Sequence, residues 1–235
     1  MPVDNPMCNQ KQFLSGLNKL SLSLSPQQTD SILLYCQELQ KWSKRVNLIA
    51  RNTSPTDIVE KHFLDSLTLL PVIRQYGLEQ GKVGNDRDNE VSLVDVGSGA
   101  GFPGLVLAAV LPELTVTLVE PRQKRVSFLR HIIRILGLTN VQVTDQRIEP
   151  GQAWDGPECT FITSRAVAAT DTFLPLIEGI ATEKTVVIMM GATDESSLPG
   201  QEKQIAAGWQ CLEEQKFTLP FSHHPRVLTL LQKVA

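Results

Sequence analysis

The stretch that decides the fold runs from Val91 to Gly104 and reads VSLVDVGSGAGFPG. Its apolar run reaches Asp95, and a turn that contains Gly97, Gly99 and Gly101 follows almost at once. Because open α/β sheets bind ligands at the carboxyl ends of their strands, this turn is expected at the ligand-binding edge. Glycine suits a backbone that turns sharply and approaches a ligand without a side chain in between. The stretch therefore predicts a strand, a nucleotide-cofactor loop and a helix that begins near Pro103.

An acidic partner for this loop is Glu120, which closes the next predicted strand and can accept hydrogen bonds from both ribose hydroxyls. That spacing fits NAD as well as S-adenosylmethionine, and Gly99 to Gly104 match the dinucleotide pattern G-x-G-x-x-G literally. The register argues against NAD. In the dinucleotide fingerprint the first glycine directly follows the strand, and here that glycine is Gly97. Counted from Gly97, the third glycine of the fingerprint would fall at position 102, which is Phe102. Phe102 is expected to cover the bound cofactor instead. The loop alone leaves both cofactors open.

Downstream of the loop, short β-rich runs alternate with helical patterns. The runs are nearly continuous in apolar residues, which is typical of strands buried on both faces of a parallel sheet. They cover residues 92–96, 116–120, 141–145, 161–166 and 185–190, and two further runs near 211–219 and 227–231 are too close together for a parallel crossover. We expect an α/β fold: a mostly parallel seven-stranded sheet with a terminal antiparallel hairpin, as in Rossmann-like class I methyltransferases that use S-adenosylmethionine.

The N-terminal region predicts helices without strands. One helix is expected to begin at Ser25 and Pro26, where Gln28 completes a capping-box pattern. A second is expected to begin at Ser54 and Pro55 and to end near Pro71. The polar, glycine-rich stretch 77–90 predicts a loop. The predicted division is a helical region at 1–76, a linker at 77–90 and a methyltransferase domain at 91–235.

Composition limits the possible functions. The net charge of −3 argues against binding nucleic acid through bulk charge, so any RNA contact must be local. The four cysteines are isolated from one another and from histidine at metal spacing, which predicts reduced thiols and no metal site. Neither a leader pattern nor an apolar run of about 18 residues is present, so the expected location is the cytoplasm, away from membranes.

Five segments together resemble the bacterial family of 16S rRNA (guanine-N7) methyltransferases, also called glucose-inhibited division protein B. They are KWSKRVNLIA at 41–50, VEKHFLDSL at 59–67, VDVGSGAGFPG at 94–104, VEPRQKRVSFL at 119–129 and ITSRAVA at 162–168. The resemblance implies an enzyme that transfers a methyl group from S-adenosylmethionine to N7 of one guanine in the 530 loop of 16S rRNA.

The resemblance also implies cofactor-site residues. Gly97 and Phe102 belong to the cofactor loop, Ile148 and Glu149 match the segment that flanks the adenine, and Arg165 matches a cofactor-site arginine. The alternative for Arg165 is an ordinary surface ion pair. The chain departs from the family at Met190, where similar members carry a lysine, so a phosphate or substrate contact is expected to be missing there.

Guanine N7 carries no proton, so this reaction needs no general base, and no catalytic residue is assigned. His62, Asp65 and Ser66 resemble a family motif, and two interpretations remain equally open: they shape the substrate side of the pocket, or they form a helix-packing network. The pair of histidines at 223–224 has no further ligand nearby and is expected to bind no metal.

RNA contact is expected at local basic clusters. One cluster lies at the end of the first helix with Lys41, Lys44 and Arg45, and the other follows Glu120 with Arg122 and Arg125. The alternative is a solvated helix face. The expected partner is 16S rRNA or the small ribosomal subunit, bound by a monomer.

Two other functions remain open at this point. The first is a methyltransferase of the same fold that acts on a protein or a small molecule. The second is a non-catalytic module that binds NAD or another nucleotide.

Overall fold

The computed structural model describes residues 9–79, 91–165, 170–192 and 208–234. Its sheet has seven strands in the order β3-β2-β1-β4-β5-β7-β6. The strands are β1 (Ser92–Val96), β2 (Thr115–Val119), β3 (Val141–Thr144), β4 (Phe161–Arg165), β5 (Val186–Gly191), β6 (Trp209–Thr218) and β7 (Pro225–Lys233). Strands β1 to β5 pair in parallel, whereas β7 is antiparallel to both β5 and β6. The predicted parallel sheet with a terminal hairpin is confirmed.

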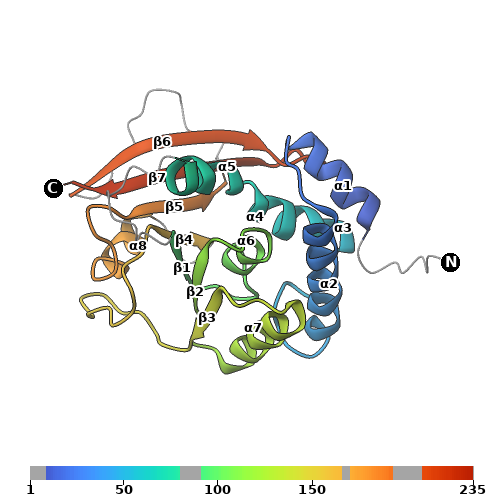
Figure 1. Ribbon diagram of the computed structural model, residues 1–235, viewed down its shortest axis with the longest axis horizontal. Coiled ribbons are helices and arrows are strands. Elements are labelled where there is room, and N and C mark those ends of the chain that lie inside the picture. The colour runs from blue at the N-terminus through green and yellow to red at the C-terminus, as the bar shows by residue number, and fades with distance from the viewer. Residues whose placement is uncertain (1–8, 80–90, 166–169, 193–207, 235) are drawn as a thin grey trace.

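Helices cover both faces of the sheet (Figure 1). The helices α2 (Pro26–Ser43), α6 (Gly104–Val110) and α7 (Gln123–Leu136) lie on one side, with α8 (Thr170–Leu176) on the other. Each side has its own apolar core, one around Leu105 and Phe128 and the other around Phe173 and Ile162. Residues at or just after the carboxyl ends of β1, β2, β4 and β5 line one cavity, at the edge where the sequence predicts a ligand site.

The capping box at the start of α2 is also confirmed. Gln28 donates its backbone N–H to the Ser25 hydroxyl (3.2 Å), and the Gln28 side chain accepts from the Ser25 N–H (2.7 Å). The apolar face of the helix buries Ile32, Tyr35 and Leu39. This burial fixes the helix against the body of the molecule.

The second N-terminal helix differs from the prediction. It consists of α3 (Pro55–Ile58), a π-helical segment η1 (Val59–Leu64) and α4 (Asp65–Leu67), and the chain continues through α5 (Leu70–Ile73) and η2 (Arg74–Glu79). Pro71 therefore opens α5 instead of ending a helix, because proline in a first turn gives up no helical hydrogen bond. A further helix, α1 (Gln10–Lys19), precedes the predicted ones.

The N-terminal helices share a core with the sheet. Phe13 and Leu64 belong to the same buried apolar cluster as Leu93 and Val116. Residues 77–79 of the predicted linker lie in η2, and Gly77 packs against Phe161 of β4, while residues 80–90 lie outside the described part. The helices are therefore part of the framework that positions the glycine loop.

Among the described residues, no helix is both long enough and apolar enough to cross a membrane. The same residues contain no group of three side chains that could hold a metal ion. Cys159 and Cys211 are free, but Cys36 in α2 is disulfide-bonded, which corrects the expectation that all four thiols are reduced.

Candidate cofactor and substrate site

The glycine loop after β1 adopts a conformation that favours glycine. Gly97, Gly99 and Gly101 have φ angles of 72°, 60° and 90°. A Cβ added at Gly99 would meet nothing nearer than 3.7 Å, so this part of the loop presents bare backbone to open space. At Gly101 the reverse holds, since a Cβ there would lie 2.3 Å from the Tyr35 hydroxyl. The loop is open on the ligand side and tightly packed on the protein side.

Tyr35 of α2 holds the packed side of this loop. Its hydroxyl donates a short hydrogen bond to the Ala100 carbonyl. Its ring stacks on Phe102 at 5.8 Å between centroids and meets Phe63 edge-on at 5.1 Å. The residue is fully buried. An N-terminal helix thus sets the position of the loop that is expected to bind the cofactor.

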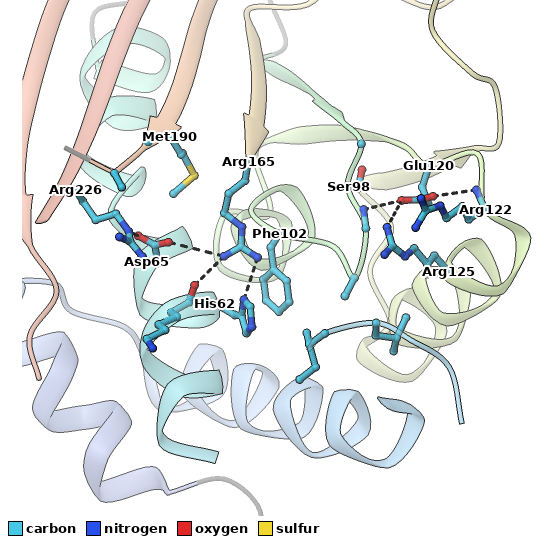
Figure 2. Close-up of a pocket in the computed structure, with 18 of the residues that line it drawn as sticks. His62, Asp65, Ser98, Phe102, Glu120, Arg122, Arg125, Arg165, Met190 and Arg226 are labelled. Atoms are coloured by element: carbon cyan, nitrogen blue, oxygen red, sulfur yellow. Dashed lines mark hydrogen bonds and ion pairs between the residues drawn. The ribbon is translucent and has the colours of Figure 1, made fainter. Parts of the chain in front are cut away.

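Glu120 follows β2 and turns its carboxylate toward the loop. It accepts hydrogen bonds from the backbone N–H groups of Gly99 and Arg122, both at 2.9 Å, and Arg125 lies 3.5 Å away (Figure 2). The side chain is 3% exposed, so these contacts fix a buried charge. Within the described residues, Oε1 accepts only from Arg122, which leaves it a lone pair for a ribose hydroxyl.

Asp95 is a buried residue that stabilises the framework beneath the loop. It is fully buried, and its Oδ2 accepts the Gly104 N–H at 3.0 Å, which satisfies a donor at the start of α6. Burial raises the pKa of Asp95 to about 7, against the lowering effect of the Gly104 hydrogen bond and of Arg165. The carboxyl therefore links β1 to α6 from beneath the loop.

A cavity of about 730 Å³ opens between the glycine loop and the N-terminal helices. Residues from several separate parts of the chain meet there. They are Leu48, Ile49, Lys61, His62, Asp65, Gly97, Ser98, Gly99, Ala100, Phe102, Glu120, Pro121, Arg122, Arg125, Arg165, Met190, Gly191, Ala192 and Arg226. This volume is within the range of small-molecule sites.

Arg165, at the end of β4, lies at the centre of a polar network in this cavity (Figure 2). It donates to the Lys61 carbonyl at 2.8 Å and to His62 Nδ1 at 3.0 Å. Its guanidinium lies 4.9 Å from the Phe102 ring centroid, a cation–π distance. Arg165 is therefore a cavity residue with a mostly buried guanidinium, and its role in binding the cofactor stays a prediction.

Asp65 balances the charge of two arginines. Its Oδ1 accepts from Arg226 Nε at 3.2 Å, and its Oδ2 lies 3.8 Å from Arg165 Nη1. Burial raises the pKa of Asp65, and Arg226 and Arg165 oppose that shift. The carboxylate thus connects α4 with β7 and β4.

His62 is held in its neutral form. Burial and the positive charge of Arg165 lower the pKa of His62 to about 3. The imidazole stacks on Phe102 with centroids 5.0 Å apart and planes 22° apart. A neutral ring with so low a pKa is a poor general base at physiological pH.

Several residues predicted for the site do not line this cavity. Asp95 lies beneath the loop and Gly101 is on its packed side, against Tyr35. Ser66 is fully buried, and its hydroxyl donates to the His62 carbonyl at 2.6 Å. Ile148 packs on the second core and Glu149 is exposed, so the adenine-flanking role of both stays a prediction. Lys41 pairs with Glu38 at 2.6 Å, and Lys44 and Arg45 line a separate cavity.

The structure adds residues that the sequence analysis missed. Arg226 projects into the cavity from β7, on the side where Met190 stands, and supplies positive charge there (Figure 2). Lys61 lines the same cavity beside the predicted His62. Strand β7 begins earlier than its apolar run predicts, and the signal that could have found Arg226 is an arginine at the start of a strand that pairs with β5.

The sheet order, the glycine loop and the acidic residue after β2 define a methyltransferase of the class I fold. A family model described as "GidB: rRNA small subunit methyltransferase G" matches residues 28–226, and the chain belongs to this family.

Similar proteins agree with this assignment. A protein named ribosomal RNA small subunit methyltransferase G from Desulfotalea psychrophila is 38% identical over 220 residues, which cover 92% of this chain and 95% of the relative. One of the same name from Oceanobacillus iheyensis is 32% identical, covering 95% and 90%. A solved structure of MtNAS in complex with MTA and tNA superimposes with a TM-score of 0.57 at 19% identity, covering 95% of this chain and 82% of that one, which shows the shared fold.

The chain is therefore an S-adenosylmethionine-dependent methyltransferase. This confirms the methyltransferase prediction and decides between the two cofactors that the glycine loop alone left open. The cavity fits that cofactor: Gly97 and Gly99 offer exposed backbone, Glu120 offers a buried carboxylate, and Phe102 offers an aromatic wall. The non-catalytic NAD module is not supported.

Proposed function

We propose that this enzyme methylates N7 of one guanine in 16S rRNA, in the 530 loop, as a cytoplasmic monomer that acts on the RNA or the small ribosomal subunit. The proposal rests on one observation: three segments that are far apart in the sequence line the same cavity. The glycine loop, the segment with His62 and Asp65, and Arg165 all line it. Two relatives named as small-subunit rRNA methyltransferases support the choice of RNA over a protein or a small molecule.

The chemistry asks the chain to position two reactants and to exclude water. S-adenosylmethionine supplies the methyl group from its sulfonium when bound. Gly99 and Glu120 would hold the nucleoside part of the cofactor. Phe102, which is 4% exposed, forms an apolar wall of the cavity. Guanine N7 attacks through a lone pair and loses no proton, so the low pKa of His62 is compatible with the reaction.

A path for RNA lies next to the cofactor cavity. A second cavity of about 630 Å³ is lined by Lys44, Arg45 and Arg51, and Ile49 lines both cavities. All three cations are exposed, so they can neutralise phosphates. Arg122 and Arg125 line the cofactor cavity itself and extend the positive charge to its far side.

The proposal is tested by expressing the gene in a bacterium whose 16S rRNA lacks this methylation. Mass spectrometry of nuclease digests should find one added 7-methylguanosine per 16S rRNA, located in the 530 loop. Glu120→Ala should add none, because the loop loses its buried carboxylate partner. Unchanged rRNA, or a methyl group at another base or atom, would refute the proposal.

The RNA path has its own test. Replacing Lys44, Arg45 and Arg51 together by alanine should weaken RNA binding and make the slope of log Kd against log salt shallower. The slope should fall by roughly 0.7 to 0.9 for each phosphate that the variant no longer neutralises. Affinity for S-adenosylhomocysteine should stay at the wild-type value. An unchanged salt slope in filter-binding assays would remove this surface from the RNA interface.

A further inference from the structure

The tautomer of His62 is fixed by Arg165. An arginine side chain has only donors, so His62 Nδ1, which lies 3.0 Å from Arg165 Nη2, must accept. The ring is neutral, as its lowered pKa of about 3 indicates, and a neutral imidazole carries one proton. That proton is therefore on Nε2, and the second nitrogen of His62 is a donor.

This donor is available to a ligand. Within the described part of the chain, Nε2 of His62 has no hydrogen-bond partner, although the residue lines the cavity. The nearby cations are already engaged, since Arg165 and Arg226 contact Asp65 and Lys61 pairs with Asp57 at 2.8 Å. His62 thus gives the cavity an uncharged donor in a fixed orientation, held from one side by Arg165 and from its face by Phe102.

Guanine has an acceptor that suits such a donor. Its O6 lies beside N7 on the same edge of the base, whereas adenine has a donating amino group at that position. Methylation of N7 leaves a positive charge on the purine. A neutral donor to O6 avoids the repulsion that a lysine or arginine would add as this charge develops.

We propose that His62 determines base specificity by donating its Nε2–H to guanine O6, with Arg165 as the positioning residue that fixes the tautomer. This inference rests on the proposed function, because it needs guanine N7 as the methyl acceptor. It gives the segment around His62 a role in selecting guanine over adenine, beyond packing.

The test uses rRNA prepared by ligation with one of three bases at the methylated position. Guanosine has O6, inosine keeps O6 but lacks the 2-amino group, and 2-aminopurine riboside lacks O6 but keeps the 2-amino group. The wild-type enzyme should methylate inosine at a rate within about threefold of guanosine. It should be about 10- to 100-fold slower on 2-aminopurine, because the Nε2–H is left unpaired in a buried site.

Two variants separate this role from a structural one. His62→Phe keeps an aromatic ring against Phe102 but has no donor, so its preference for inosine over 2-aminopurine should be about tenfold smaller than that of the wild type. His62→Gln can accept from Arg165 and still donate, so it should retain most of the preference. Inosine and 2-aminopurine differ in intrinsic reactivity. This difference cancels when the ratio of the two rates is compared between enzymes, because every enzyme is assayed on the same two bases.

The possible outcomes test the role of His62 and the proposed methylation of guanine separately. Equal slowing of His62→Phe on both bases would make His62 a structural residue and overturn the inference. A wild-type enzyme that methylates 2-aminopurine as fast as inosine would also overturn it, even if His62→Phe fails to fold. A wild-type enzyme that leaves both guanosine and inosine unmethylated would instead refute the proposed function.

Discussion

Tyr35 shows that the role of a residue can depend on contacts with a part of the chain that is far away in the sequence. Helical periodicity assigns it to the apolar face of α2, and it is indeed buried there. Its hydroxyl also bonds to Ala100, 65 residues further along the chain, and its ring stacks on Phe102. The periodicity of a helix predicts which side chains are buried, but it carries no information about what their polar atoms meet.

Replacing Tyr35 by phenylalanine should weaken cofactor binding. The ring and its stacking stay, but the Ala100 carbonyl loses its donor in a buried place, which costs about 1–3 kcal/mol. We expect lower stability in denaturant unfolding and a severalfold weaker affinity for S-adenosylhomocysteine in calorimetry.

The matched control is Tyr76→Phe. Tyr76 donates to Glu213 at 2.7 Å, on the edge strand β6 and away from the loop. This change should leave the affinity for S-adenosylhomocysteine at the wild-type value. Equal weakening in both variants would show that Tyr35 acts only through general stability.

At the level of elements, the sequence predicts those that depend on local patterns. Buried strands, the glycine turn and the capping box at Ser25 follow from neighbouring residues alone. The helical segment around Pro71 escapes such prediction because a proline can either end or begin a helix, and packing decides which. The same limit applies to the site: Arg165 directly ends a recognisable strand, whereas Arg226 comes from a hairpin whose register no local pattern fixes.

The contact between α4 and β7 should be energetically significant. Asp65 is 5% exposed and pairs with Arg226, so removing either partner leaves a poorly solvated charge. A double-mutant cycle with Asp65→Asn and Arg226→Met should give a coupling energy of about 1–3 kcal/mol in denaturant unfolding.

The comparison for this cycle is the pair Asp57 and Lys61 in the same helical segment. Both side chains are 35% exposed, so the cycle with Asp57→Asn and Lys61→Met should give at most about 0.5 kcal/mol. Equal coupling in the two cycles would mean that burial of Asp65 adds nothing to the connection between α4 and β7.

The molecule as a whole contains two buried groups whose titrations oppose each other. His62 has a pKa of about 3 when folded, against an ordinary value of 6.5, so the unfolded chain takes up its proton first as pH falls. Asp95 has a pKa of about 7 when folded, against an ordinary value of 3.8, so the unfolded chain releases its proton first as pH rises. His62 therefore reduces stability as pH falls from about 6.5 toward 3, and Asp95 reduces it as pH rises from about 4 toward 7.

These opposite slopes predict opposite behaviour for two variants, measured as unfolding free energies relative to the wild type between about pH 4 and pH 7. His62→Gln should gain relative stability as pH falls, because its side chain has no proton to take up. Asp95→Asn should gain as pH rises, because the amide can still accept from Gly104 and carries no charge. Each change should be on the order of 2–4 kcal/mol across the window. If the unfolding free energies of the two variants change with pH in parallel, neither group is desolvated to this extent. The pKa of His62 would then give no support to a neutral ring with one fixed tautomer.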